Sequence, residues 1–209
     1  MFPEKKLLFA TQNKGKAGEV SQLFSSMNLN FATLLDLGID SDTNETGATF
    51  EENAILKVSE ALRKINTDAI IMADDSGIEI DALGGEPGVH TRRWSGKTMT
   101  DDEILAYCLA RLNGVPSDKR TARFRSVVAV GSKSHDIKTF EGQLEGVILN
   151  NPVGSVRKGL PFCPVFYVPN WKMLLSDTYD LPPHKKSEYI THRVQAFQKA
   201  IPYILAISE

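Results

Sequence analysis

The chain has 209 residues, with 24 Lys and Arg against 26 Asp and Glu and a formal net charge of −2. This balance leaves no basic excess to follow a nucleic-acid backbone, so we expect no nucleic-acid polymer among its partners. Apolar residues make up 42% of the chain and charged residues 24%, which is typical of a globular protein with a substantial core and not of a disordered one.

The termini and the cysteines exclude further classes of protein. The N-terminal residues have no signal-peptide pattern, and no stretch is apolar for long enough to span a bilayer, so we expect a cytoplasmic protein with no membrane partner. The two cysteines, Cys108 and Cys163, show neither a disulfide framework nor zinc spacing. Cys108 lies in an apolar helical stretch, which indicates a core position.

In the first half of the chain, short apolar runs typical of strands alternate with amphipathic runs typical of helices. Thr49 and Glu52 have the capping-box spacing, which predicts that a helix begins at this point. An apolar stripe with spacings of three and four residues follows, from Phe50 to Ile65. Strands are predicted at 7–10, within 28–40, at 69–73 and at 77–81, and helices at 17–27 and from 50 to about 65.

The second half carries a long hairpin between helical segments. Two strand-like runs flank the polar residues 133–136, a pattern that predicts an antiparallel pair. In chain order the predicted segments are a helix from 100 to about 114, strands at 122–132 and 137–150, a loop with a short strand within 152–169, and a helix at 187–204. This order predicts one mixed α/β domain over residues 1–209, with two lobes and a cleft between them.

The most informative run is Asp74-Asp75-Ser76-Gly77, which follows the apolar residues 69–73. Successive side chains of a strand point to opposite faces, so only one of Asp74 and Asp75 can face a given cleft. Adjacent carboxylates suit a divalent cation that is shared with substrate phosphates. An ordinary turn is the alternative, because Asp, Ser and Gly are also common turn residues.

A polar loop of residues 11–16 lies between the first predicted strand and the first predicted helix. Backbone N–H groups at a helix N-terminus can face an anion there, Lys14 and Lys16 add positive charge, and Gly15 allows a phosphate to approach closely. The spacing is neither that of a Walker loop nor that of a dinucleotide-binding loop. A solvated loop is the alternative interpretation.

Three further places could carry chemistry. Asn53 and Lys57 are four residues apart and therefore on one face of their helix. Glu45 lies in a polar loop just upstream, and His192 and Arg193 lie near the start of the last helix, where Arg can bond a carbonyl and His can donate or accept. Taken singly, each is better read as an ordinary surface position.

Together and in this order, these pieces resemble the inosine triphosphate pyrophosphatase family, whose members hydrolyse non-standard purine nucleoside triphosphates such as ITP, dITP and XTP. The resemblance spans nearly the whole chain. The matching segments are residues 9–16, 45–47, 49–57, 73–77, 84–89, 93–96 and 191–193.

The resemblance implies an elongated α/β fold with a central mixed sheet flanked by helices, two lobes, and a homodimer. It also implies a reaction in which a nucleoside triphosphate and water give the monophosphate and pyrophosphate, with Mg²⁺ as the cofactor. The substrate would be held by the loop residues Thr11, Gln12, Asn13, Lys14, Gly15 and Lys16.

The other roles that the resemblance implies divide into phosphate chemistry and base recognition. Lys57 would neutralise the triphosphate, Asp75 would bind the metal and accept a proton with Ser76 beside it, and Glu45 would help to hold the metal. His192 and Arg193 would recognise the purine. Arg193 would reach the 6-oxo group, which distinguishes hypoxanthine from adenine.

The chain departs from the family pattern in residues 159–164. Leu160 takes the place of the aromatic residue that stacks on the base, and Cys163 the place of an Asp that helps to read it. Phe162 is the candidate for stacking instead. The family lysine before the His-Arg pair falls at Ser187, which leaves Lys186 as the candidate for its role.

These departures leave two alternatives beside hydrolysis of ITP, dITP or XTP in nucleotide-pool house-cleaning. One is the same phosphate chemistry on a different or modified nucleotide, which the altered residues 159–164 favour. The other is a nucleotide-binding paralogue without turnover, which the retained phosphate-side residues disfavour.

Overall fold

A computed structural model of the chain describes residues 6–25, 31–39, 43–66 and 68–208. Its contacts divide it into two compact units. The first unit comprises Met1–Ser76, Ser126–Gly142 and His192–Glu209. The second comprises Gly77–Arg125 and Gln143–Thr191.

The strands form a mixed sheet in the order β2-β1-β3-β5-β6-β7-β8, with β4 paired to β3. β1 runs parallel to β2 and β3, whereas β3–β4, β6–β7 and β7–β8 are antiparallel. The strand bounds are β1 Leu7–Phe9, β2 Phe31–Thr33, β3 Ile70–Ile80, β4 Pro87–Gly88, β5 Thr121–Gly131, β6 Lys138–Ile148, β7 Phe166–Val168 and β8 Met173–Leu174. The predicted mixed α/β fold with a sheet flanked by helices is confirmed.

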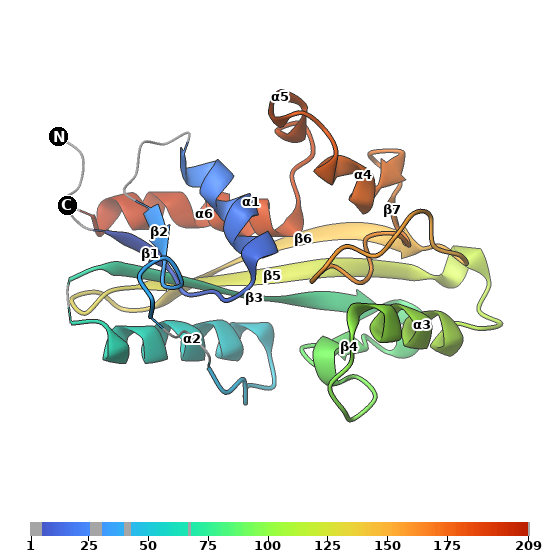
Figure 1. Cartoon of the computed structure of the whole chain (residues 1–209), viewed down its shortest axis with the longest axis horizontal. Coiled ribbons are helices and arrows are strands. Elements are labelled where there is room, and N and C mark those ends of the chain that lie inside the picture. The colour runs from blue at the N-terminus through green and yellow to red at the C-terminus, as the bar shows by residue number, and fades with distance from the viewer. Residues whose placement is uncertain (1–5, 26–30, 40–42, 67, 209) are drawn as a thin grey trace. The chain divides into compact units, whose positions relative to one another are not determined.

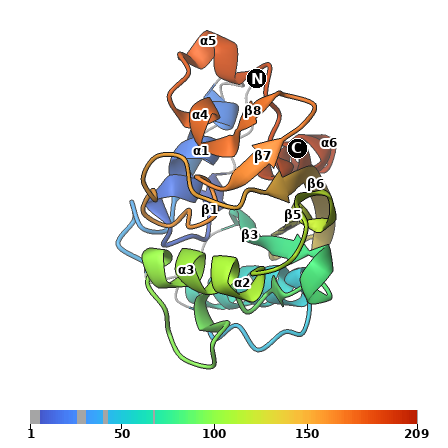
Figure 2. The ribbon, with the colours of Figure 1, turned by 90° about the vertical axis from the view of Figure 1, so that its right-hand side faces the viewer.

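The helices are α1 Lys14–Ser25, α2 Phe50–Lys64, α3 Asp101–Arg111, α4 Leu175–Tyr179, α5 Pro183–Lys186 and α6 His192–Ala206. In the first unit, α1 and α6 cover one face of the strands and α2 covers the other (Figures 1 and 2). No helix in the described ranges is long and apolar enough to cross a membrane.

Alternation along the strands builds the core of the first unit. Phe9 of β1 and Met72 of β3 are fully buried in a cluster with Phe24 of α1 and Phe197 of α6. Residues with the opposite parity, such as Ile71, must face α2 because successive strand side chains point to opposite faces. One face of β3 therefore packs against α1 and α6, and the other packs against α2.

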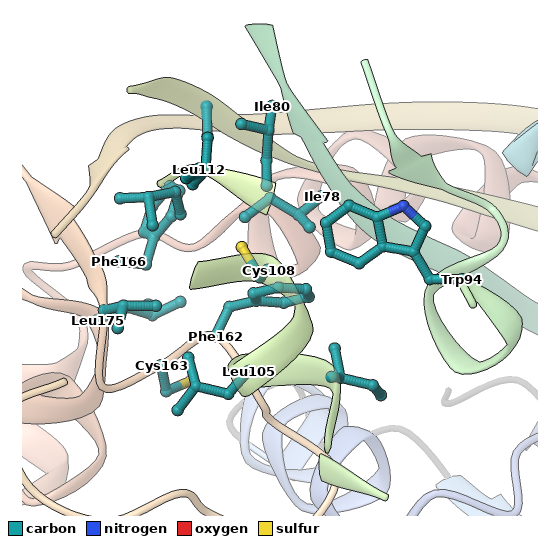
Figure 3. Packing of buried hydrophobic residues seen from close by; sticks show 14 of the residues in the cluster. Ile78, Ile80, Trp94, Leu105, Cys108, Leu112, Phe162, Cys163, Phe166 and Leu175 are labelled. Atoms are coloured by element: carbon teal, nitrogen blue, oxygen red, sulfur yellow. The ribbon is translucent and has the colours of Figure 1, made fainter. Parts of the chain in front are cut away.

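The core of the second unit lies around Phe162, which packs against Trp94 and Phe124 (Figure 3). Both cysteines, Cys108 and Cys163, are buried in the same cluster. Burial raises the pKa of the Cys108 thiol to about 12. The core position predicted for Cys108 is confirmed.

The separate strands predicted at 69–73 and 77–81 are wrong, because β3 continues unbroken from Ile70 to Ile80. Asp, Ser and Gly at 74–77 are turn residues by propensity. Here Asp74 and Asp75 each pair with cations on opposite sides of the strand, and that arrangement needs extended, alternating backbone.

Two predicted helix starts are also wrong. α1 begins at Lys14 and not at residue 17, because the Asn13 Oδ1 accepts backbone bonds from Gly15 (2.9 Å) and Lys16 (3.2 Å) and caps the helix. The predicted end of this helix at residue 27 lies outside the described residues. α6 begins at His192 and not at 187, because the chain first makes a turn after α5.

The other predicted elements are confirmed, including their starts. The Thr49 hydroxyl accepts from the Glu52 N–H at the start of α2, and Thr100 forms a complete capping box with Glu103 at the start of α3. β5 and β6 are neighbours in the sheet, and residues 132–137 are too short a connection for a parallel crossover, so they form the predicted hairpin.

Gly142 of β6 determines how closely the first turn of α6 approaches the sheet. A Cβ at this position would lie 2.0 Å from the carbonyl oxygen of His192 and 2.6 Å from the amide nitrogen of Ala196. No side chain fits in that gap, so α6 packs directly on the backbone of β6.

Gly142→Ala is expected to destabilise the protein by about 1–3 kcal/mol, because the methyl group would force the first turn of α6 away from β6. Urea unfolding measures the change. The control is Gly18→Ala within α1, where a Cβ would meet nothing within 4 Å and should stabilise the helix by about 0.5–1 kcal/mol. Equal stability of Gly142→Ala and the wild type would contradict this packing.

Candidate active site

The candidate site is built on β3, where Asp74 and Asp75 occupy successive positions. Asp74 has the parity of Met72 and faces α1 and α6, and Asp75 faces α2. Both are buried, with 2% and 7% of their surfaces exposed. A buried carboxylate requires compensation by cations or hydrogen bonds, so each face must supply its own.

On the first face, Asp74 is compensated by two cations. Its Oδ2 lies 3.1 Å from the Lys16 Nζ and 3.1 Å from the Arg193 Nε. The hydroxyls of Ser76 and Ser126 donate to the same oxygen at 3.2 and 3.5 Å. Burial acts to raise the pKa of Asp74, but the charges of Lys16 and Arg193 outweigh it and hold the pKa well below the ordinary range.

Arg193 extends this cluster to α1. Its NH1 group donates to the Glu19 Oε2 at 2.6 Å, and its NH2 group donates to the Ser76 Oγ at 3.0 Å. With Asp74 on Nε, partners on three nitrogens fix the plane of the guanidinium. His192 beside it is buried, and burial, with the charge of Arg193, lowers its pKa well below 6.5, so the imidazole is neutral.

On the second face, the ammonium of Lys57 is surrounded by three oxygens. It lies 2.7 Å from the Glu45 Oε1, 2.8 Å from the Asp75 Oδ1 and 3.2 Å from the carbonyl oxygen of Asp74. Burial acts to lower the pKa of Lys57, but the charges of Asp75 and Glu45 outweigh it and raise the pKa. Asn53 donates to the other Asp75 oxygen at 3.1 Å.

Burial also raises the pKa of Asp75 above its ordinary value, against the opposing charges of Lys57 and Lys16. A carboxylate with raised proton affinity is a better general base near neutral pH than an exposed one. The second face therefore places a basic carboxylate and a second acid each within hydrogen-bonding distance of one ammonium.

The loop of residues 11–16 leads directly into α1. Thr11 is buried, and its hydroxyl accepts from the Asn13 N–H at 3.2 Å, whereas Gln12 is exposed. Asn13 uses its side-chain oxygen to cap the helix. Gly15 and Lys16 lie in the first turn; the side chain of Lys14 is outside the described part.

The candidates from the departing segment belong to the second unit. Phe162 and Cys163 are 2% and 1% exposed, so neither side chain presents an accessible surface. Both lie in the core of the second unit (Figure 3), and Leu160 packs against the same core. Lys186 ends α5 and is partly buried.

A divalent cation fits the donor set on the second face. The oxygens of Glu45, Asp75 and Asp74 already converge on the Lys57 ammonium, which marks a position that favours positive charge. Mg²⁺ is usually held by one or two carboxylates plus phosphates and waters. Among the residues that the structure describes there is no cluster of three or more His, Cys, Asp or Glu side chains that could hold a metal ion.

Glu19 and Asp74 were missed by the sequence analysis as partners of the site. Glu19 lies three residues after Lys16, so a helix beginning at Lys14 places both on one face of α1. The prediction that this helix starts at residue 17 left Lys16 outside it, so the common face of Lys16 and Glu19 was not recognised. For Asp74 the alternation argument gave the direction of the side chain but could not name its partners on α1 and α6.

A family model described as the Ham1 family matches residues 7–203. A dITP/XTP pyrophosphatase from Geobacillus kaustophilus is 38% identical over 195 residues, covering 93% of this chain and 92% of the relative. The protein of the same name from Listeria monocytogenes is 38% identical over 194 residues, with the same coverage of each chain.

Two solved structures are similar to the fold. The Ham1 protein of Staphylococcus aureus matches with a TM-score of 0.78 and 30% identity, and a HAM1 protein from Coxiella burnetii with a TM-score of 0.79 and 31% identity. Each comparison covers 97% of this chain and 99% of the other. The predicted resemblance is confirmed: the chain belongs to the Ham1 family.

Proposed function

We propose that the chain hydrolyses non-standard purine nucleoside triphosphates of the ITP, dITP and XTP type to the monophosphate and pyrophosphate. The observation that carries the proposal is the Lys57 ammonium shared between Asp75 and Glu45 on the second face of β3. It provides a cation for phosphates beside a carboxylate of raised proton affinity. Relatives that are 38% identical have the name dITP/XTP pyrophosphatase.

In the proposed reaction, water attacks the α-phosphorus and the bond to the bridging oxygen of the β-phosphate breaks. Asp75 accepts the proton of the water, and pyrophosphate leaves with the bridging oxygen. Lys16 and Lys57 neutralise the phosphate charge, which is greatest on the leaving group in the transition state. The N–H groups of Asn13, Gly15 and Lys16 bond to side chains within the loop, so the charge of Lys16 is the loop's main contribution to holding the anion.

Glu45 and Asp75 would hold Mg²⁺ together with the substrate phosphates. When bound, the ion would add Lewis-acid stabilisation of the phosphates and lower the pKa of a bound water. The protein itself then has to orient the carboxylates of Glu45 and Asp75 toward the ion. It also has to keep Lys57 close enough to neutralise part of the phosphate charge.

His192 and Arg193 are the proposed base-recognition residues. A neutral imidazole has one donor and one acceptor, and a guanidinium that is fixed in its plane can donate to a carbonyl such as the 6-oxo group. From the family resemblance we also propose a cytoplasmic homodimer.

A second candidate is the same chemistry on a different or modified nucleotide. It is favoured by Leu160 and Cys163, which stand where the family has a stacking aromatic and an Asp. It is also favoured by the burial of Phe162, the candidate for stacking instead, in the core of the second unit. A binding protein without turnover is disfavoured, because the chain retains both acids and both lysines of the phosphate side.

Pyrophosphate release from ITP, XTP, dITP, dUTP, ATP and GTP with Mg²⁺ tests the function. We expect the oxo-purine substrates to be the best, and Asp75→Asn to lower kcat by about 10²–10⁴-fold because the proton acceptor is lost. Asp118→Asn, an exposed position, is the matched control. Release from dUTP alone would favour the second candidate, and release from no substrate would refute the enzyme.

Removal of the metal is the second test. Chelation with EDTA should abolish pyrophosphate release, and added Mg²⁺ should restore it. Glu45→Gln should raise the Mg²⁺ concentration for half-maximal activity by at least about tenfold, because one proposed donor loses its charge. The exposed Glu188→Gln serves as control. Full activity in EDTA would contradict metal dependence.

Burial of neutral His192 predicts a pH dependence of stability. The unfolded chain binds a proton near pH 6.5 and the folded chain does so only well below it, so stability should fall as the pH decreases below 6.5. The contribution of one such proton is at most about 1.4 kcal/mol per pH unit. Urea unfolding between pH 6.5 and 5 should show a shallower decrease for His192→Gln, and no change for His184→Gln at an exposed position. Equal slopes for wild type and His192→Gln would show that His192 does not stay neutral.

A further inference from the structure

Asn53 in the first turn of α2 is a buried amide with partners on both of its polar atoms. It is 1% exposed. Its Oδ1 accepts the backbone N–H of Gly47 at 2.8 Å, and its Nδ2 donates to the Asp75 Oδ2 at 3.1 Å. One side chain therefore links three segments: the loop before α2, α2 itself and β3.

The bond to Asp75 completes the orientation of that carboxylate. The Asp75 Oδ1 receives the Lys57 ammonium at 2.8 Å, and the Oδ2 receives the Asn53 amide. Asn53 and Lys57 are one helical turn apart, so both donors reach Asp75 from the same side of α2. Because the two donors bind different oxygens, they prevent rotation of the Asp75 carboxylate. One donor alone would allow it to rotate.

The bond to Gly47 fixes the loop that carries Glu45. A Cβ on Gly47 would lie 2.7 Å from the Asn53 Oδ1 and 2.7 Å from the Glu52 Cβ, so the loop lies directly against α2. The neighbouring Ala48 N–H donates to the Glu52 Oε2 at 2.6 Å. Glu45, two residues before Gly47, is thereby held where it pairs with Lys57 at 2.7 Å.

The amide is suited to these two partners by its chemistry. A backbone N–H needs an acceptor and an ionised carboxylate needs a donor, and Asn offers one of each from the same branch point. An Asp at this position would place a second negative charge against Asp75. An apolar side chain would leave the Gly47 N–H and an Asp75 oxygen without this partner.

We propose that Asn53 is a positioning residue. It fixes the Asp75 carboxylate relative to the loop that carries Glu45, so that the two acids present their oxygens to one divalent cation. The proposal rests on the metal-dependent function proposed above. Asn53 itself touches neither the phosphates nor the cation in this scheme. Groups that orient metal ligands in this way commonly change metal affinity by about 10–100-fold when they are removed.

A purely structural role for Asn53, in which the amide only attaches the loop to α2, makes a different prediction. Stability would then fall, but the folded variant would bind the cation as the wild type does. Metal affinity of the folded protein therefore separates the two roles.

The experiment is a titration of Mn²⁺ into the full chain in the presence of a saturating nucleoside α,β-methylene triphosphate, which cannot be hydrolysed. The electron paramagnetic resonance signal of free Mn²⁺ measures how much of the ion is bound. Asn53→Ala is expected to weaken Mn²⁺ binding at least about tenfold. Asn66→Ala, the same change at an exposed position after α2, should bind as the wild type does. Circular dichroism confirms that each variant is folded at the temperature of the titration.

Asn53→Ser is the second variant and covers the case in which Asn53→Ala does not fold. Its hydroxyl can serve one partner at a time, so the expected loss of Mn²⁺ affinity is several-fold, between the wild type and Asn53→Ala. The Mg²⁺ concentration for half-maximal pyrophosphate release should rise in the same order.

Folded Asn53 variants that bind Mn²⁺ with wild-type affinity would overturn the positioning role and leave the proposed function intact, provided that the wild type releases pyrophosphate in a Mg²⁺-dependent way. A wild-type chain that neither binds Mn²⁺ nor needs Mg²⁺ would overturn both the positioning role and the metal dependence on which it rests, whereas the hydrolysis itself is tested by pyrophosphate release.

Discussion

The need to compensate two neighbouring buried carboxylates governs the organisation of the first unit. Removing an ionised carboxylate from water costs several kcal/mol unless cations and hydrogen bonds replace the solvent. Asp74 and Asp75 follow each other in β3 and point to opposite faces, so different cations pair directly with each side chain. The chain meets this requirement with Lys16 and Arg193 on one face and Lys57 on the other.

The need for these charge pairs also restricts where the surrounding helices can lie relative to β3. Lys16 reaches Asp74 from the first turn of α1, which the Asn13 side chain caps. Arg193 reaches it from the first turn of α6, which packs on the bare backbone of Gly142. Lys57 reaches Asp75 from α2. A shift of any of these helices by a fraction of a turn would leave a charge buried without its partner.

The sequence predicted those parts of the fold that depend on local rules. The Thr49 cap, the apolar stripe of α2 and the mixed sheet follow from spacing and alternation, and the family resemblance came from motifs. The break in β3 was wrongly predicted because turn propensity at 74–77 is overruled by charge pairs with residues far along the chain, such as Arg193. Strand alternation predicted that Asp74 and Asp75 point to opposite faces, but it did not predict which cations pair with each of them. Glu19 was missed as a partner because the start of α1 was predicted three residues late, and helix boundaries are the least certain feature of a sequence-based prediction.

Asp74 links the two halves of the proposed chemistry through one atom. Its Oδ2 contacts both Lys16, proposed to neutralise phosphate, and Arg193, proposed to read the base. A movement of either cation changes the field that the other experiences, because both share this acceptor. The altered residues Leu160 and Cys163 lie outside this network, in the core of the second unit. Both residues are uncharged and belong to the other unit, so the charge pairs around Asp74 do not depend on them.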